Sequence, residues 1–213
     1  MVPRKTKRVI TQMEEKKKRI LDCAIDLFVL KGYMNTPVRD IIDVSGYGTS
    51  TFYRYFKDKE DLLTVLLSNF LDQIIDKVKE YFKQEQDVYK RFVESKRVIM
   101  EVFAANPKLS EIYIRVGGLS ESVDKCLKEF DDRYLCFVKQ NIEYGVKYGY
   151  FKNLPIYPIS HSILAIIKYA IFKWIVLKEI SQEEMIEMVV SFHQSLGEGL
   201  YQRILKEETQ ALM

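Results

Sequence analysis

The stretch that decides the fold runs from Thr36 to Glu60. Its sequence is Thr-Pro-Val-Arg-Asp-Ile-Ile-Asp-Val-Ser-Gly-Tyr-Gly-Thr-Ser-Thr-Phe-Tyr-Arg-Tyr-Phe-Lys-Asp-Lys-Glu. Thr36 is a good N-cap, and Pro37 fits the first helical position after it. Gly46 ends this short helix, and a second helix can begin near Thr49. The stretch therefore predicts two short helices joined by a glycine turn.

The second of these helices is predicted to have a buried face and a free face. Phe52 and Phe56 lie four residues apart, so both side chains face the core. A helix that enters the DNA major groove needs small residues at its beginning, where the backbone comes close, and hydroxyl or cationic groups nearby to hold phosphates. The DNA-binding residues predicted on this basis are Thr36, Arg39, Tyr47, Gly48, Thr49, Ser50, Thr51, Tyr53, Arg54, Tyr55, Lys57 and Lys59.

The composition predicts a chain built from long helices. Its 213 residues are 47% hydrophobic with only 9 Gly and 5 Pro, so a sizeable core with few interruptions is expected. Apolar residues recur at helical spacing, as at Ile20, Ala24, Leu27 and Phe28, and no alternating strand pattern occurs. Residues before about Gln12 form a polar, basic arm. The expected fold is all-α with about nine helices, near residues 12–31, 36–45, 48–56, 60–82, 89–105, 109–116, 123–148, 159–178 and from 181 onward, where Ser181 and Glu184 form a capping box.

Charge divides the chain into two predicted domains. Residues 1–60 hold 13 Lys/Arg and 8 Asp/Glu, whereas the remaining residues hold 20 and 22. A basic N-terminal end is expected for a module that binds a polyanion, although the run Lys16–Arg19 can equally be a solvated helix surface. We therefore predict a DNA-binding domain over residues 1–59 and a helical ligand-binding and dimerisation domain over residues 60–213.

Several classes of protein are not indicated. The three cysteines are widely spaced and form no CxxC, so neither a disulfide framework nor a metal site is expected, and no cofactor is expected. No apolar region follows the basic N-terminus as a secretory signal requires. The most apolar stretch, Ile163–Leu177, contains two lysines and is shorter than the roughly 20 residues that span a bilayer. No catalytic motif is present. The sequence predicts a cytoplasmic protein that is not an enzyme and has no membrane partner.

The N-terminal residues resemble those of a known family. The runs Ile20–Phe28, Lys31–Tyr33 and Thr36–Leu63 are similar to the N-terminal domain of the tetracycline-repressor (TetR) family, and Thr51–Glu60 is very like that family's exit from the recognition helix. The resemblance implies a homodimer that binds palindromic double-stranded DNA, with its final two helices forming the dimer interface. It also implies that the middle helices enclose a small-molecule inducer whose binding releases the DNA.

The turn and the beginning of the recognition helix depart from the usual family pattern. Tyr47 stands where a small aliphatic residue is common, and Gly48, Thr49 and Ser50 stand where Ser-Lys-Gly is frequent, so operator preference cannot be carried over. Tyr47 can either pack over the turn or reach a phosphate with its hydroxyl, and Tyr55 can face the groove or be half buried. For Tyr53, the matching family position favours phosphate contact.

Two further sets of residues are predicted in the second domain, one from the high aromatic content of the middle helices that the resemblance places around an inducer, and one from the helical spacing of the last two helices. An apolar pocket with a few hydroxyls is predicted at Met100, Phe103, Tyr113, Phe130, Tyr134, Phe137, Tyr144 and Trp174. A dimer interface is predicted at Ile163, Ile167, Ile171, Met185, Val189, Phe192, Leu196 and Leu200. Both sets can instead be plain core. His161 and His193 are isolated and are interpreted as structural or surface residues.

Two other functions remain open from the sequence. A DNA-organising or division-regulating protein of the same fold would bind many DNA sites and act with a protein partner. A sensor that has lost DNA binding is disfavoured by the intact stretch Thr36–Lys59. The expected function is therefore a ligand-responsive bacterial transcriptional regulator, most simply a repressor.

Overall fold

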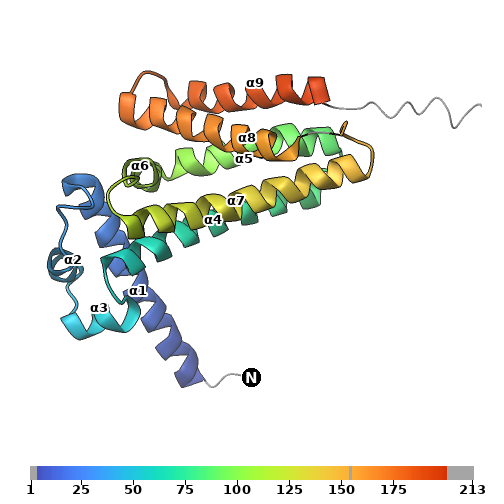
Figure 1. The fold of residues 1–213 in the computed structure, drawn as a ribbon. Helices are drawn as coiled ribbons and strands as arrows, with labels where there is room; N and C mark the ends of the chain where they lie inside the picture. Colours follow the sequence, from blue (N-terminus) through green and yellow to red (C-terminus); the bar gives the residue numbers. More distant parts are fainter. Residues whose placement is uncertain (1–3, 154, 201–213) are drawn as a thin grey trace, which may run out of the picture. The chain divides into compact units, whose positions relative to one another are not determined.

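The computed structural model describes residues 4–153 and 155–200, and every element in this part of the chain is helical (Figure 1). The helices are α1 (Arg4–Lys31), α2 (Val38–Ser45), α3 (Thr49–Tyr55), α4 (Lys59–Gln84), α5 (Val88–Ala105), α6 (Pro107–Arg115), α7 (Glu121–Lys147), α8 (Ile156–Ile171), the π-helix η1 (Phe172–Leu177) and α9 (Gln182–Leu200). The predicted all-α fold is therefore confirmed.

The chain forms two compact units. Unit 1 contains Met1–Phe70 and Lys108–Lys128, and unit 2 contains Leu71–Pro107 and Glu129–Met213. Helices α4 and α7 thus contribute residues to both units. The predicted domains, 1–59 and 60–213, divide the chain by function, and that division stays a prediction. Compactness divides it differently, because the first half of α4 and the α6 segment group with the N-terminal helices.

Helix α1 supplies the apolar stripe around which unit 1 forms. Ile20, Ala24, Leu27 and Phe28 are all buried, as their spacing predicts. Gly32 ends the helix with a positive φ of 82°, and its N–H donates to the Phe28 carbonyl at 3.0 Å. The predicted N-terminal arm is wrong within the described residues, because the helix already runs from Arg4. Its arginines, lysines and Gln12 are good helix formers, and the segment contains no Gly or Pro to interrupt it.

The beginning of α2 differs from the prediction. Thr36 does not cap the helix: Pro37 occupies the cap position, with φ −72° and ψ 154°, and α2 begins at Val38. The Thr36 hydroxyl turns back instead and donates to the carbonyl oxygens of Gly32 at 2.8 Å and Leu27 at 3.3 Å. Carbonyls at the end of a helix lack partners in their own helix, so this hydroxyl satisfies the end of α1.

Helices α5, α8 and α9 form the closely packed part of unit 2, with α9 beside both α8 and α5 (Figure 1). The predicted capping box of α9 is confirmed: Ser181 N–H donates to Glu184 Oε2 at 2.7 Å, and Glu184 N–H donates to Ser181 Oγ at 3.2 Å. These bonds lower the pKa of Glu184. At Gly197, an added Cβ would come within 2.9 Å of the Tyr89 ring, so this glycine allows α9 to lie against α5.

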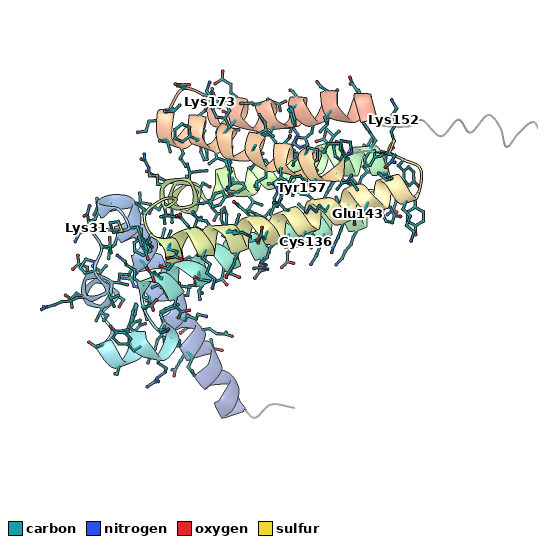
Figure 2. All side chains as sticks on the ribbon, viewed as in Figure 1. Lys31, Cys136, Glu143, Lys152, Tyr157 and Lys173 are labelled. Carbon is teal, nitrogen blue, oxygen red and sulfur yellow. The ribbon has the colours of Figure 1, made fainter. Side chains whose placement is uncertain are left out.

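Helix α8 and η1 make one apolar segment, Ile156–Leu177, which is the single helix of the described residues long and apolar enough by length and composition to cross a membrane. Tyr157 near its beginning and Lys173 near its end are labelled in Figure 2. Its two lysines are paired, Lys168 with Asp131 and Lys173 with Glu179, the latter at 3.2 Å. Only 33% of its apolar window is buried. The apolar composition therefore belongs partly to a face that the single chain leaves uncovered.

Replacing Thr36 by valine tests its structural role. Thr36→Val keeps the shape of the side chain but removes the donor to two carbonyls, so it should lower the free energy of unfolding by about 1–2 kcal/mol. Urea unfolding followed by circular dichroism measures this change. Asn35→Ala is the matched control, because the exposed Asn35 amide also donates to a carbonyl at the end of α1. An unchanged midpoint for Thr36→Val would contradict the assignment.

Candidate functional site

Helix α3 is held by the two phenylalanines that its spacing identified. Phe52 and Phe56 are each only 1% exposed, and their rings lie 5.6 Å apart. Gly46 ends α2 with φ +75°, a conformation that favours glycine, and Gly48 occupies the cap position of α3. The short helix is therefore fixed along one side, and its beginning carries no bulky side chain.

The opposite side of α3 and its flanking residues are open to solvent. Tyr53 is 56% exposed and Arg54 is exposed beside it. Of the predicted DNA-binding residues, the exposed ones are Arg39, Gly48, Thr49, Ser50, Tyr53, Arg54 and Lys57, and the half-buried ones are Tyr47, Thr51, Tyr55 and Lys59. Exposed hydroxyl, aromatic and guanidinium groups on one short helix can contact both the phosphates and the base edges of a DNA duplex.

Thr36 is the one member of the set that the structure excludes. Its side chain is 0% exposed and its hydroxyl is used within the chain, so its prediction as a DNA-binding residue is wrong. A threonine before a proline can cap the following helix or donate to the end of the preceding one. The sequence pattern does not separate these roles.

Lys59 has an internal partner that the sequence did not indicate. Its Nζ donates to the Tyr33 carbonyl at 2.8 Å and lies 4.3 Å from the centre of the Tyr33 ring. Partial burial lowers the pKa of Lys59, while the charge of Glu60 acts in the opposite direction. Lys59 therefore connects the beginning of α4 to the loop after α1. A DNA contact by its remaining N–H groups stays a prediction.

Tyr47 lies half buried at the turn. Its backbone N–H donates to Ser45 Oγ at 3.4 Å, and Lys16 Nζ from α1 lies 5.9 Å from its ring centre. This geometry favours packing over the turn, one of the two roles considered for this residue.

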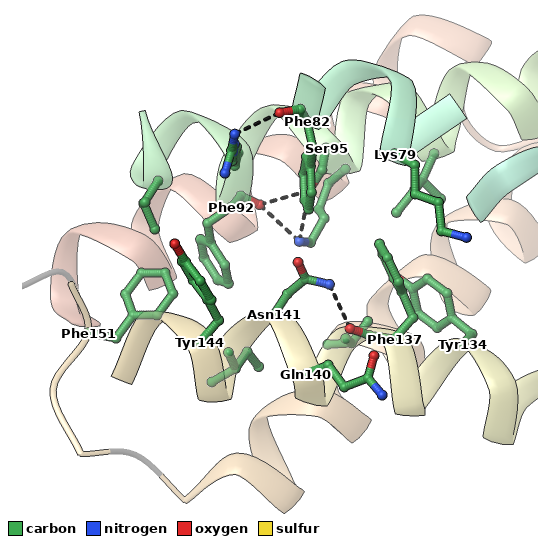
Figure 3. A pocket seen from close by; sticks show the side chains of 16 residues that line it. Lys79, Phe82, Phe92, Ser95, Tyr134, Phe137, Gln140, Asn141, Tyr144 and Phe151 are labelled. Atoms are coloured by element: carbon green, nitrogen blue, oxygen red, sulfur yellow. Dashed lines mark hydrogen bonds between the residues drawn. The ribbon is translucent and has the colours of Figure 1, made fainter. Parts of the chain in front are cut away.

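Unit 2 contains a cavity of about 340 Å³ between residues of α4, α5 and α7 (Figure 3). Its size lies at the lower end of the range for small-molecule sites. The lining residues are Lys79, Phe82, Val88, Arg91, Phe92, Ser95, Lys96, Ile99, Tyr134, Phe137, Val138, Gln140, Asn141, Ile142, Tyr144 and Phe151. The walls are mainly aromatic and aliphatic, and they include several polar groups.

The predicted pocket agrees with this cavity only in part. Tyr134, Phe137 and Tyr144 line it, whereas Met100, Phe103, Tyr113, Phe130 and Trp174 do not. Met100, Phe103, Tyr113 and Phe130 are at most 5% exposed and serve as core, and Trp174 lies half buried on η1. Helical spacing identifies an inward-facing side chain but does not tell whether packed neighbours or a cavity lie in front of it.

The most unusual wall residue is Lys96 on α5. It is 7% exposed, and its Nζ donates to the Phe92 carbonyl at 2.9 Å and to Ser95 Oγ at 3.1 Å. Both bonds are drawn in Figure 3. Burial lowers the pKa of Lys96 to about 7 because removal from water disfavours the charged form. Lys96 is not among the predicted site residues, although a lysine among the apolar residues Phe92, Val93, Ile99 and Met100 is a signal that the sequence contains.

Two other buried polar groups lie in this part of unit 2. The Tyr134 hydroxyl has no hydrogen-bond partner among the described residues, and burial raises the pKa of Tyr134. His193 of α9 packs on Phe92 with ring centres 5.9 Å apart and donates from Nδ1 to the Val189 carbonyl at 2.6 Å. Burial and the charge of Lys96 lower the pKa of His193 to about 3, so the imidazole is neutral near pH 7.

One end of the cavity depends on Gly145. The chain turns after α7, where the N–H groups of Tyr150 and Phe151 both donate to the Gly145 carbonyl, at 2.8 and 3.1 Å. An added Cβ at Gly145 would lie 2.1 Å from the Phe151 ring. Only a glycine at this position lets the Phe151 side chain take its place in the cavity wall.

The predicted dimer residues lie largely inside the chain. Ile163, Ile167, Ile171, Met185 and Val189 are at most 2% exposed, so the single chain already buries them and they cannot form the interface. Phe192 and Leu196 are half buried, and the side chain of Leu200 lies outside the described residues. The regular apolar stripes on α8 and α9 face their own unit. On α8 and η1, the exposed residues Ser162, Ala165, Tyr169 and Phe172 instead recur on one helix face.

Comparisons with known proteins agree with this geometry. Residues 20–66 match the family model for bacterial regulatory proteins of the tetR family. The crystal structure of a TetR-family transcriptional regulator from Syntrophomonas wolfei is 58% identical, with a TM-score of 0.85 and coverage of 86% of this chain and 95% of that one. YuxN, an uncharacterised helix-turn-helix transcriptional regulator of Bacillus subtilis, is 27% identical over 127 residues, which are 59% of this chain and 44% of that protein.

A further solved structure shares the fold alone. FadR from Bacillus subtilis, solved in complex with stearoyl-CoA, has a TM-score of 0.72 at 20% identity, over 82% of this chain and 97% of that one. By contrast with the Syntrophomonas wolfei protein, the chain spans less than half the length of YuxN.

Removing the buried amine should stabilise the protein without ligand. The pKa of Lys96 is about 7 in the folded chain, against the ordinary lysine value of 10.5 that applies in the unfolded chain. Between these pH values the unfolded chain therefore binds more protons than the folded one. Wild-type stability should therefore rise with pH across this window. Lys96→Met should be more stable than wild type by on the order of 2 kcal/mol at pH 7, and the difference should narrow toward pH 10. Urea unfolding at several pH values measures it, and a pH-independent difference would contradict the assignment.

Proposed function

The chain belongs to the TetR family of bacterial regulatory proteins, and we propose that it is a ligand-responsive transcriptional repressor. In this proposal, a homodimer binds a palindromic operator in the cytoplasm, and a small apolar inducer in the cavity of unit 2 releases it. The family consists of transcriptional regulators, which are not enzymes. The observation that carries the proposal is the exposed side of α3, which presents Thr49, Ser50, Tyr53 and Arg54 while Phe52 is buried.

DNA binding is supported by the arrangement of these groups along α3. Thr49 and Ser50 stand at the N-terminal end of the helix, which in a helix-turn-helix lies closest to the base edges. Tyr53, Arg54 and Lys57 follow with a hydroxyl and two cations suited to phosphates. In a dimer, two such helices would enter successive major grooves roughly 34 Å apart. We infer that the first residues choose the sequence and the later ones hold the backbone.

An apolar inducer is supported by the walls of the cavity. Phe82, Phe92, Ile99, Phe137 and Phe151 are among its apolar lining residues, and burying apolar ligand surface against them is favourable. The solved complex of FadR with stearoyl-CoA is a further indication that this fold can accept a long apolar ligand. Helix α4 carries Lys79 and Phe82 on the cavity wall and begins directly after α3. We propose that α4 transmits the effect of the ligand to the DNA-binding helix.

A homodimer is supported by the uncovered side of the α8–η1 segment. Tyr169 is 51% exposed and Phe172 is 36% exposed, and they share a helix face with Ala165. Exposed apolar side chains that gather on one face mark an interaction site. We therefore place the dimer interface on this face, next to the half-buried Phe192 and Leu196 of α9. This assignment replaces the buried stripes that spacing alone had suggested.

The DNA-binding assignment predicts different effects along α3. Arg54→Gln should weaken binding to all duplexes alike and reduce the slope of log K against log salt by about 0.9, because one phosphate contact is lost. Thr49→Ala should instead change the preferred sequence. The duplex is obtained by selecting binders from a randomised DNA library with the wild-type protein, and fluorescence anisotropy at several salt concentrations measures affinity.

Two outcomes of that selection would count against the proposal. If Arg54→Gln leaves the salt dependence unchanged, the phosphate assignment is wrong. If the selected duplexes carry no palindrome and all sequences bind equally, the protein is better described as a DNA-organising protein of the same fold.

The dimer assignment predicts that one charge on α8 separates the subunits. Tyr169→Glu places a carboxylate in the proposed interface and should convert the protein to a monomer of 25.2 kDa, observed by light scattering after size exclusion. Tyr148→Glu is the matched control, because Tyr148 on unit 2 is 52% exposed but lies off the proposed face. A Tyr169→Glu protein that stays dimeric would place the interface elsewhere.

A further inference from the structure

We propose that the cavity of unit 2 selects an apolar ligand that carries a carboxylate, and that this carboxylate pairs with Nζ of Lys96. The inference rests on the proposed function, in which the cavity holds the inducer, and it names the chemical class of that inducer. It is carried by the charge of the cavity wall, by the hydrogen bonds of Lys96 and by the unpartnered Tyr134 hydroxyl.

The charged side chains of the cavity wall are all positive. Lys79, Arg91 and Lys96 are among the sixteen lining residues, and no Asp or Glu is. Charges of one sign along a low-dielectric cleft attract and concentrate ligands of the opposite sign. A cationic ligand would lack a counter-charge in this cavity, and a neutral one would leave the positive groups unused. The wall therefore favours an anion attached to an apolar body.

Lys96 is the one of these three cations that is buried, and both of its hydrogen bonds end on uncharged groups. An ammonium group has three donors, and the two bonds of Lys96 end on a carbonyl and a hydroxyl, neither of which is charged. A lysine as buried as this one is rare without an ionic partner. Arg91 is different, since its Nε and Nη2 donate to the carbonyls of Glu85 and Phe82, and it is only half buried.

Among the described residues that line the cavity with Lys96, none is an Asp or Glu. His193 is the titratable group packed on Phe92 from α9, and the charge of Lys96 lowers its pKa, so the imidazole stays neutral. Tyr134, which is 4% exposed, also lines the cavity, and its hydroxyl has no hydrogen-bond partner among the described residues. A carboxylate on the ligand would supply the missing charge and an acceptor for such donors.

Three probes that share one apolar chain test the head group. Isothermal titration at pH 6.5 compares the binding of decanoate, methyl decanoate and decylamine to the protein. Wild type should bind decanoate at least about tenfold more tightly than methyl decanoate, since a charged hydrogen bond is lost with the ester. Decylamine should bind most weakly, because its ammonium meets Lys96.

Variants of the two cavity lysines assign the effect to one residue. Lys96→Met should bring decanoate and methyl decanoate within about twofold of each other while methyl decanoate still binds. Lys79→Met is the matched control, because Lys79 also lines the cavity but is exposed; it should keep the preference for decanoate, since solvent screens its charge. Tyr134→Phe is a second variant, and should weaken decanoate more than the ester.

The pH dependence of binding is an independent readout. Above its pKa of about 7, Lys96 is mainly in the uncharged amine form, which cannot pair with a carboxylate. The affinity for decanoate should therefore fall between pH 7.5 and 9, by up to about tenfold per pH unit. The other charged or titratable groups facing this region are Lys79 of α4, Arg91 of α5, Tyr134 and Tyr144 of α7, and His193 of α9. The fall should be absent in Lys96→Met, which separates Lys96 from all of these.

The outcomes distinguish this inference from the proposed function. If decanoate and its ester bind wild type equally, the inference is wrong while an apolar inducer remains supported. Decanoyl-CoA could bind wild type far more tightly than decanoate does, and bind Lys96→Met equally well. The protein would then recognise the phosphates of the ligand without Lys96, which also overturns the inference. If none of the probes binds wild type, both the inference and the apolar inducer are contradicted.

Discussion

The burial of Phe52 and Phe56 is the contact on which the DNA-binding unit depends. Helix α3 has only seven residues, and a helix this short is not stable alone in water. Burying each phenylalanine contributes roughly 1.5–3 kcal/mol, which is enough to hold the helix in a single orientation. The same burial determines which residues stay outside, because side chains on the other face of so short a helix have no core to enter. The recognition surface is thus a consequence of how α3 is anchored.

The cavity of unit 2 contains residues that lower the stability of the folded chain. A fully apolar wall would be more stable than one that contains Lys96, whose charged form is disfavoured by burial. Gly145 and Gly197 also lower stability, because glycine is a poor helix former. Gly145 lets Phe151 lie close to the end of α7, and Gly197 lets α9 lie close to α5. Stability given up at a cavity is typical of residues retained for binding. The two units therefore divide the work: one presents a rigid surface and the other a cavity with an uncompensated charge.

The sequence predicted those features that depend on local pattern. The stripe on α1, the glycine turn at Gly46, the buried Phe52 and Phe56 and the capping box of Ser181 and Glu184 follow from spacing and cap chemistry, and the structure confirms them. Features that depend on which elements meet in space could not be predicted in this way.

Particular residues illustrate that limit. Thr36 has the sequence features of a helix cap but donates to the end of the preceding helix. Ile163 and Val189 have the spacing of an interface, but their own chain buries them. Lys96 stands among apolar residues in the sequence, but its lowered pKa results from burial in the folded unit, which local spacing does not give.

Control of DNA binding by occupancy of the cavity can be followed in a single titration. The protein is bound to a labelled duplex selected from a random library, and decanoate is added while fluorescence anisotropy reports the DNA complex and calorimetry reports occupancy of the cavity. If the cavity holds the inducer, the complex dissociates over the same concentration range in which the cavity fills. A DNA complex that keeps its full affinity when the cavity is saturated would contradict it.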